Sequence, residues 1–153
     1  MLENVIENRG FADLMQNSIQ ELIIHFFQIE QNFGILCKIE DARFEPELPS
    51  DINSEFRPLT LFFLAGYTFE TARIEGDFLL FEAGFGADNF GSVVTIPLLS
   101  ILQIIVDETP ILINLSVYKK EPTAKVQKSS EKGVKNSMES FLSNPENSKF
   151  LKK

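Results

Sequence analysis

The sequence predicts an α+β fold, in which one N-terminal amphipathic helix packs on a small, strongly curved antiparallel β-barrel and a disordered tail follows. One observation is that apolar residues first recur at helical spacing and then alternate along several short runs. A second is that charge changes near residue 118: residues 1–118 hold 5 Lys and Arg against 18 Asp and Glu, and residues 119–153 hold 9 against 4. We therefore divide the chain into a globular acidic domain, 1–118, and a flexible basic tail, 119–153.

The predicted helix spans Gly10–Gln28. Its apolar side chains recur every three or four residues, and at about 100° per residue they cover more than half of the helix circumference. One sheet face needs a narrower stripe, so the surplus can bury against a second subunit. The residues of the stripe are Phe11, Met15, Ile19, Leu22, Ile23, Phe26 and Phe27.

About six strands are predicted after the helix, mostly joined by short turns, which gives a small antiparallel barrel or a curled sheet. The acidic, proline-bearing stretch Glu45–Pro58 is interpreted as a surface loop, and Glu75-Gly76-Asp77 as a hairpin turn. Leu98–Ile104 is compatible with either a helical turn or an irregular strand. The expected strands are Ile35–Glu40, Leu59–Ala65, Tyr67–Ile74, Phe78–Phe85, Ser92–Ile96 and Ile111–Tyr118.

The last of these strands has a regular alternation. Its odd-numbered residues are all apolar, whereas the even-numbered ones include an asparagine, a serine and a tyrosine. This pattern predicts that the odd-numbered side chains face the core. They are Ile111, Ile113, Leu115 and Val117.

Composition excludes several classes of protein. The single cysteine, Cys37, cannot form an intramolecular disulfide, and the acidic N-terminal residues are unlike a secretory signal, which together indicate a cytoplasmic protein. The least polar stretch, Val93–Val106, is shorter than the roughly 18 residues that a membrane span needs. A strongly acidic domain also repels nucleic-acid phosphates. We expect neither membrane nor nucleic acid as a partner.

Catalytic and metal-binding patterns are weak. One histidine and scattered carboxylates give no metal-ligand spacing, so we expect no metal and no cofactor. His25 and Cys37 could form a base and nucleophile pair, but a surface histidine and a buried thiol explain them better. The glycines around Gly84–Gly91 precede a strand and lack a following lysine, unlike a phosphate-binding loop. We expect no catalytic residue and no enzyme.

The basic tail contains two apolar pairs, Phe141-Leu142 and Phe150-Leu151. Lysine-flanked apolar residues at the free end of a long polar segment are typical of a tethered docking peptide. The sequence does not decide which pair docks. Spacer residues without a partner remain the alternative.

Two segments carry a family likeness: Phe81-Glu82-Ala83-Gly84-Phe85-Gly86, and Val94–Ile104 with its Val-Thr-Ile-Pro-Leu-Leu start. These segments, and the order of elements around them, resemble the SspB (stringent starvation protein B) family of proteolytic adaptors. The likeness spans most of the chain. The resemblance implies a non-enzymatic homodimer, joined through its N-terminal helix, that binds an unstructured degron such as the ssrA tag.

The resemblance also implies two sets of binding residues. Ala83, Gly84 and Phe85, with Tyr67 and Phe69 on the preceding strand, are expected to line the peptide groove. The docking module for the ClpX unfoldase of ClpXP is expected at the end of the tail. Its residues are Lys149, Phe150, Leu151, Lys152 and Lys153.

Two other classes of function stay open. A cytoplasmic assembly or secretion chaperone, whose acidic domain masks a client segment, would also suit a small domain with a wide apolar helix face. An enzyme on a helix-plus-sheet scaffold would need a cluster of titratable groups in a cleft. The adaptor and the chaperone differ in what the tail does, because only the adaptor needs it for delivery.

Overall fold

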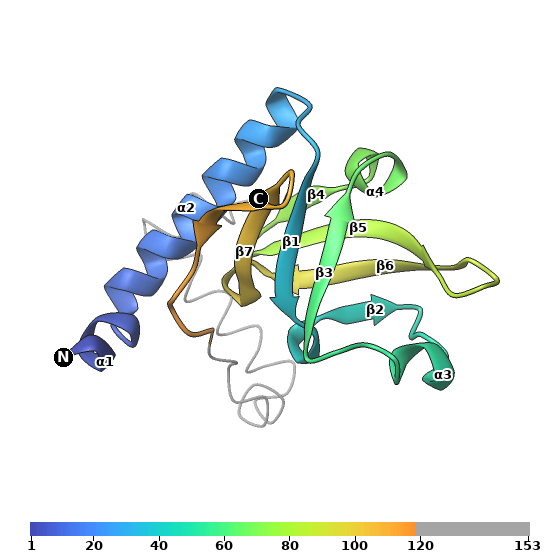
Figure 1. Ribbon diagram of the computed structural model, residues 1–153, viewed down its shortest axis with the longest axis horizontal. Coiled ribbons are helices and arrows are strands. Elements are labelled where there is room, and N and C mark those ends of the chain that lie inside the picture. Colours follow the sequence, from blue (N-terminus) through green and yellow to red (C-terminus); the bar gives the residue numbers. More distant parts are fainter. Residues whose placement is uncertain (119–153) are drawn as a thin grey trace, which may run out of the picture. The chain divides into compact units, whose positions relative to one another are not determined.

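The computed structural model describes residues 1–118, which form an N-terminal helical segment followed by strands and short helices (Figure 1). The long helix α2 begins at Arg9 and ends at Gln28, and Asn8 caps it by accepting a hydrogen bond from the Phe11 amide at 2.9 Å. The predicted helix Gly10–Gln28 is therefore confirmed. The other helices are short: α1 (Leu2–Ile6), α3 (Ser50–Asn53), α4 (Tyr67–Glu70) and the 3₁₀ helices η1 (Ile39–Asp41) and η2 (Leu98–Ser100).

The strands form two antiparallel sheets, each of four strands. We call them sheet A, in the order β3-β1-β7-β8, and sheet B, in the order β2-β6-β5-β4. The strands of one sheet cross those of the other (Figure 1). Their bounds are β1 (Phe33–Lys38), β2 (Arg43–Glu45), β3 (Leu59–Leu64), β4 (Arg73–Glu75), β5 (Phe78–Phe85), β6 (Phe90–Pro97), β7 (Ile101–Val106) and β8 (Thr109–Ile113).

The expectation of a β-barrel is wrong. Each sheet keeps two edges, β3 and β8 in sheet A and β2 and β4 in sheet B, so the strands do not close on themselves. The physical reason lies in the connections. The chain crosses between the sheets four times, through η1, the segment with α3, α4 and η2, and none of these connections continues a strand ladder into the other sheet.

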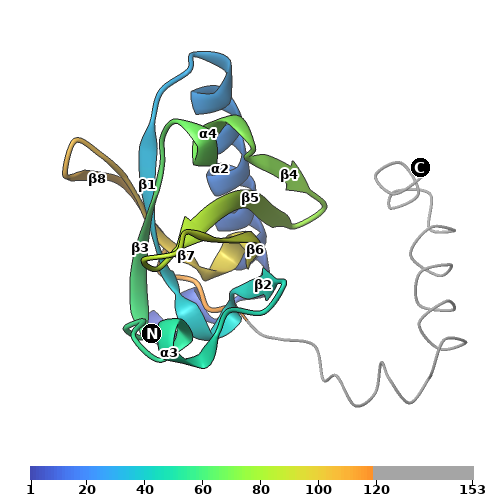
Figure 2. The same cartoon turned by 90° about the vertical axis from the view of Figure 1, so that its right-hand side faces the viewer.

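The core lies between the two sheets and is closed by α2. Ile35 and Leu64 of sheet A and Phe81 of sheet B are at most 1% exposed, and Ile19 and Ile23 of the helix are fully buried. Other buried apolar side chains of this cluster include Phe26, Phe33, Cys37, Phe62, Leu79, Val94, Ile96, Leu98, Ile101 and Ile104. Because the inward faces of both sheets share this core, their outward faces point away from each other (Figure 2).

The wide apolar stripe of α2 is mostly used within the chain. Ile19, Ile23 and Phe26 are buried, and Phe27 packs edge-on against Phe69 with ring centroids 5.8 Å apart. Leu14 is the one large apolar side chain of α2 that is mainly exposed, at 65%. Most of the apolar helix surface that suggested contact with a second subunit is therefore covered by the sheets and α4.

The predicted strand Tyr67–Ile74 is wrong in its first half, where the structure has α4 and then β4. Gly66 adopts a positive φ of 63°, which turns the chain out of β3. The Thr68 hydroxyl lies 2.9 Å from the carbonyl oxygens of Phe63 and Ala65 and accepts a hydrogen bond from the Ala65 amide. These local bonds stabilise a turn where β propensity alone favours a strand.

The last predicted strand is shorter than expected and faces the other way. The structure ends β8 at Ile113, and Ile111, Ile113, Leu115 and Val117 are 38–59% exposed. Asn114 and Ser116 are buried instead, at 3% and 5%. The Asn114 amide donates to the carbonyls of Leu99 and Ile101 at 3.1 and 3.0 Å, and these bonds fix which side of the chain faces the core.

Other expectations are confirmed. β5 spans Phe78–Phe85 as predicted, and it pairs with β4 through a hairpin in which Glu75 lies opposite Phe78. The ambiguous stretch Leu98–Ile104 contains both alternatives, η2 and then β7. No helix among residues 1–118 combines the length and the apolar content that crossing a membrane requires.

Candidate functional site

The candidate site is an open groove of about 760 Å³ that combines segments far apart in the sequence. One wall comes from the end of β3 and from α4, and the opposite side from β6 and the end of β2. The end of β5 lies between them. The lining residues are Glu45, Pro46, Ala65, Tyr67, Thr68, Glu82, Ala83, Gly84, Asn89, Gly91, Ser92 and Val93.

Two glycines contribute no side chains of their own to the groove floor. Gly84 of β5 lies directly opposite Gly91 of β6 in the ladder. The Asn89 side chain from the intervening turn fills the space over Gly84, because a Cβ built at Gly84 would lie 1.8 Å from the Asn89 Oδ1 atom. A side chain at Gly84 therefore requires Asn89 to move, whereas a Cβ at Gly91 meets no atom within 4 Å.

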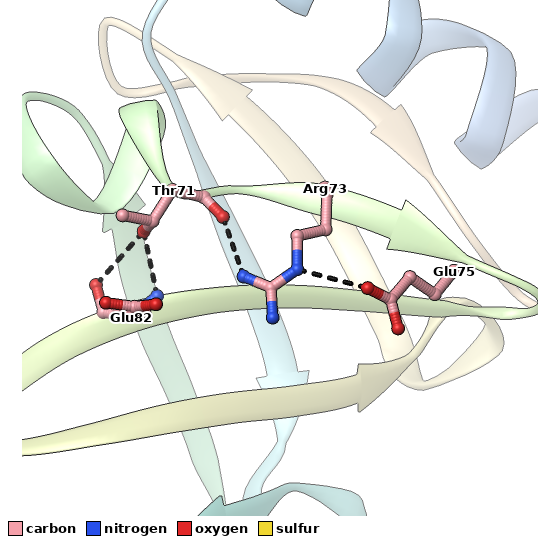
Figure 3. Close-up of polar contacts among 4 residues, drawn as sticks. All are labelled: Thr71, Arg73, Glu75 and Glu82. Atoms are coloured by element: carbon pink, nitrogen blue, oxygen red, sulfur yellow. Dashed lines mark hydrogen bonds and ion pairs between the residues drawn. The ribbon is translucent and has the colours of Figure 1, made fainter.

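The end of β5 has a free edge inside this groove. β4 pairs with β5 only from Phe78 to Leu80, so no strand flanks residues 81–85 on that side within the described chain. The Glu82 amide, which points to that side, donates to the Thr71 hydroxyl at 2.9 Å (Figure 3). Because backbone groups alternate along a strand, the N–H and C=O of Gly84 point to the same side. The groove thus offers main-chain groups to an extended ligand.

The segment from Thr71 to Glu75 is held in place beside this edge. The Arg73 guanidinium donates to the Thr71 carbonyl at 3.0 Å and to the Glu75 carboxylate at 3.2 Å (Figure 3). The Thr71 hydroxyl also donates to the Tyr67 carbonyl at 2.9 Å, one turn earlier in α4. These bonds keep the α4 wall at a fixed place next to β5.

The walls of the groove carry negative charge. The Tyr67 hydroxyl donates to the Glu82 carboxylate, and that hydrogen bond, with the negative charge of Glu82, raises the pKa of Tyr67. Glu45 lines the opposite side, and no basic side chain is among the described residues that line the groove. The site therefore repels acidic groups and attracts basic ones.

The structure brings together three of the five residues expected to bind a peptide. Tyr67, Ala83 and Gly84 all line the groove. Phe69 does not, because it packs against Phe27 and lines a separate hollow beside the end of α2.

Phe85 and the expected tail residues are also not part of the groove lining. The Phe85 ring packs edge-on against Phe44 and Phe56, with centroids 5.6 and 6.0 Å apart. The expected unfoldase-docking residues, Lys149–Lys153, lie outside the described residues.

Sequence reasoning missed most of the residues that surround this trio. Asn89 and Ser92 belong to no motif, Glu82 lies within the segment of family likeness without a predicted role, and the sequence predicts Glu45-Pro46 only as part of a loop. The β5–β6 hairpin is the feature from which they could have been found. Its register places Gly91 to Val93 opposite Glu82 to Gly84, so both segments lie at the same site. The Ser92 hydroxyl donates to the Pro46 carbonyl at 2.9 Å, which fixes the end of β2 at the groove.

The two residues considered for nucleophilic chemistry are not arranged as a pair. Cys37 is fully buried in β1, and that burial, together with the negative charge of Asp41, raises the pKa of its thiol to about 12. A thiol with this pKa is protonated at neutral pH and is a poor nucleophile. His25 is exposed on α2, where its ring neighbours Phe26 of the same helix.

Within residues 1–118, no three His, Cys, Asp or Glu side chains are grouped so that they could hold a metal ion. Comparison of the sequence with protein-family models and with curated proteins returns no match. A function for this chain therefore has to be argued from the groove itself, its free strand edge and its charge.

Proposed function

We propose that this protein is a non-enzymatic proteolytic adaptor, which holds an unstructured degron of the ssrA type in the groove and tethers the tagged protein to ClpX of the ClpXP protease. The observation that carries this proposal is the free edge of β5 inside an open groove. The sequence resemblance to the SspB family supplies the identity of the degron and of the protease.

A degron would bind here as an added strand. An extended peptide gains affinity from main-chain hydrogen bonds to a sheet edge and specificity from shallow pockets for alternate side chains. Gly84 supplies the main-chain groups, and the α4 wall with Tyr67 supplies a side-chain contact. Such recognition suits an unstructured tag, which has its own main-chain groups free for pairing.

The negative charge of the groove determines which residues of a tag peptide fit into it best. Glu45 and Glu82 are the only charged side chains among the described lining residues. Peptide residues that lie between them are therefore expected to be uncharged or basic, and acidic residues of a tag are expected to lie outside the groove. Comparing a tag peptide with an analogue whose acidic residues are replaced by amides tests this orientation.

Delivery is assigned to the basic tail, residues 119–153, whose end carries the lysine-flanked Phe150-Leu151 pair. Joining a degron-binding domain to a docking peptide makes the second binding step intramolecular, so effective concentration replaces intrinsic affinity. Weak individual contacts are then sufficient, and tagged protein and protease can separate after transfer.

The groove is tested by binding of a fluorescently labelled tag peptide, measured by anisotropy. Gly84→Glu should weaken binding by about tenfold or more, because its side chain displaces Asn89 and adds a third carboxylate to the groove. Asn17→Glu, which adds the same charge on the exposed side of α2, is the matched control and should bind like the unaltered protein. Equal affinities for the two variants would place the site elsewhere.

Delivery is tested by the rate at which ClpXP degrades a tagged reporter. The full chain should accelerate degradation, and a chain that ends at Tyr118 should still bind the tag peptide but no longer accelerate degradation. If both chains leave the rate unchanged, delivery is not the function even where the peptide binds.

A client-masking chaperone is the second candidate, and one observation favours it. Leu59, Leu61 and Phe63 of β3 are 42–63% exposed, so the domain has an apolar surface outside the groove. A chaperone would protect its client from aggregation with or without residues 119–153. Loss of function on removal of these residues therefore separates the adaptor from the chaperone.

A further inference from the structure

The outward face of sheet A is mostly apolar, and all four of its strands contribute apolar residues to it. The ladder registers define one row across the sheet, in which Leu61, Leu36, Gln103 and Ile113 lie side by side. Because paired residues of antiparallel strands point to the same side, these side chains share one face. Ile35, Cys37 and Ile104, which alternate with them, are fully buried, so this face is the outward one.

A second row continues the same face. It contains Phe63, Gly34, Ile105 and Pro110. The Phe63 ring lies over Gly34, because a Cβ built at Gly34 would be 3.2 Å from the ring, yet Phe63 is still 63% exposed. One side of the Phe63 ring therefore covers Gly34, and the other side of the ring faces solvent.

The exposed apolar area is large for a surface without a partner. Leu59, Leu61, Phe63, Ile111, Ile113 and Leu115 are each 42–63% exposed, and five of them lie on the two edge strands β3 and β8. Six large side chains that are about half exposed leave on the order of 500 Å² of apolar surface in water. An interface of standard size buries about 800 Å² per partner, so this area supplies most of one.

The charges at the two ends of this face are opposite. Lys38, the only lysine in residues 1–118, lies opposite Leu59 at one end of the strands and has no ion pair within the described chain. The β7–β8 turn, Asp107-Glu108, is at the other end, where Val106 pairs with Thr109. The face is thus mostly apolar in the middle, with the positive charge of Lys38 at one end, next to the acidic η1, and the acidic β7–β8 turn at the other.

We propose that this face is the interface with a second copy of this chain. A two-fold axis that lies in the interface and runs across the strands would place the Lys38 end of one copy against the Asp107-Glu108 end of its partner. The same operation brings apolar centre onto apolar centre. This self-complementarity is why we assign the face to a second copy and not to an unrelated protein.

The proposed interface leaves the groove free, because none of the groove-lining residues belongs to the outward face of sheet A. The inference does not depend on what the groove binds. It differs from a dimer formed through the N-terminal helix, of which Leu14 is the exposed apolar residue.

Sedimentation velocity of the full chain tests the interface. The unaltered protein should sediment as a dimer at about 50 µM, and Phe63→Asp should sediment as a monomer with an unchanged far-ultraviolet circular dichroism spectrum. Leu14→Asp is the matched control and should remain a dimer. A monomeric unaltered protein, a dimeric Phe63→Asp, or a monomeric Leu14→Asp would each overturn the proposal, the last by assigning the interface to the helix.

Charge reversal keeps the proposal testable if Phe63→Asp does not fold. Lys38→Glu and Glu108→Lys should each weaken dimerisation by about tenfold, because each places like charges against each other across the interface. The variant with both changes should dimerise more tightly than either single variant. If the combined variant is weaker than both, the two ends do not meet, and the proposed arrangement is wrong.

Discussion

At the scale of single residues, burial determines the chemistry of Cys37. The thiol lies between the sheets, and its pKa is raised to about 12 by burial first and by the negative charge of Asp41 second. The protonated thiol is therefore the form that the fold favours. In the unfolded chain the same thiol ionises at about pH 8.5.

This difference predicts how stability depends on pH. The contribution of Cys37 is fully present below about pH 8.5 and is lost as pH rises toward 12, by about 1.4 kcal/mol of unfolding free energy for each pH unit. Urea denaturation between pH 8 and 10.5 should show this loss in the unaltered protein relative to Cys37→Ala. A pH-independent difference between the two proteins would contradict the assignment.

Single residues also show what sequence could reveal about the site. The family resemblance predicts Tyr67, Ala83 and Gly84 at the peptide groove, and the structure brings these three residues together. Phe69 and Phe85 are expected at the groove from the same resemblance, but a phenylalanine is equally suited to a core. Their neighbours along the fold, Phe27, Phe44 and Phe56, come from distant segments, so local sequence could not show which role applies.

At the scale of elements, one buried amide sets the orientation of the last strand. The Asn114 Oδ1 atom accepts hydrogen bonds from the Ser116 amide at 2.9 Å and from its hydroxyl at 2.6 Å, while its Nδ2 group donates to two carbonyls. Every buried side-chain N and O atom of residues 1–118 has a partner. A fully bonded asparagine can thus displace apolar residues from the core side of a strand.

Removing this amide should be costly. Asn114→Ala leaves the Leu99 and Ile101 carbonyls and the Ser116 amide short of a partner, and we expect the free energy of unfolding to fall by about 2–4 kcal/mol. Urea denaturation at neutral pH measures this. Asn17→Ala, at an exposed position on α2, is the control and should change stability by no more than about 0.5 kcal/mol. A loss at position 114 no larger than that of the control would show that the amide does not orient the strand.

The elements that sequence predicted well are those whose signal is local. Helical spacing identified α2, and the Gly76 turn identified the β4–β5 hairpin, whose glycine has a positive φ of 63°. The errors came from tertiary contacts. The turn at α4 depends on the hydroxyl of Thr68, and the reversed face of β8 depends on carbonyls of η2 and β7, which adjacent sequence does not reveal.

At the scale of the whole molecule, the class α+β and the order of elements were predictable, but the closure of the sheets was not. Alternation shows that a residue faces a core, yet it does not show whether neighbouring strands pair into one sheet or two. The four connections between the sheets decide this, and the helices that they contain, η1, α3, α4 and η2, are only three or four residues each. Short turns of this kind have weak sequence signals.

The proposal that the domain binds the degron and the tail docks on ClpX makes a prediction about the intact chain. If a protease site is inserted after Tyr118 and then cut, both pieces remain present but the link is lost. Acceleration of tagged-reporter degradation by ClpXP should then disappear, because effective concentration requires a covalent connection. The same chain before cutting is the control. Undiminished acceleration after cutting would mean that the two pieces act independently.

The position of Lys38 has a practical consequence for experiments. Apart from the amino terminus, residues 1–118 contain no other primary amine. In a chain that ends at Tyr118, amine-reactive fluorophores would therefore attach at two positions only, Lys38 at the end of β1 and the amino terminus. Labelling also removes the charge of Lys38, so comparing the association of labelled and unlabelled chains shows what that charge contributes.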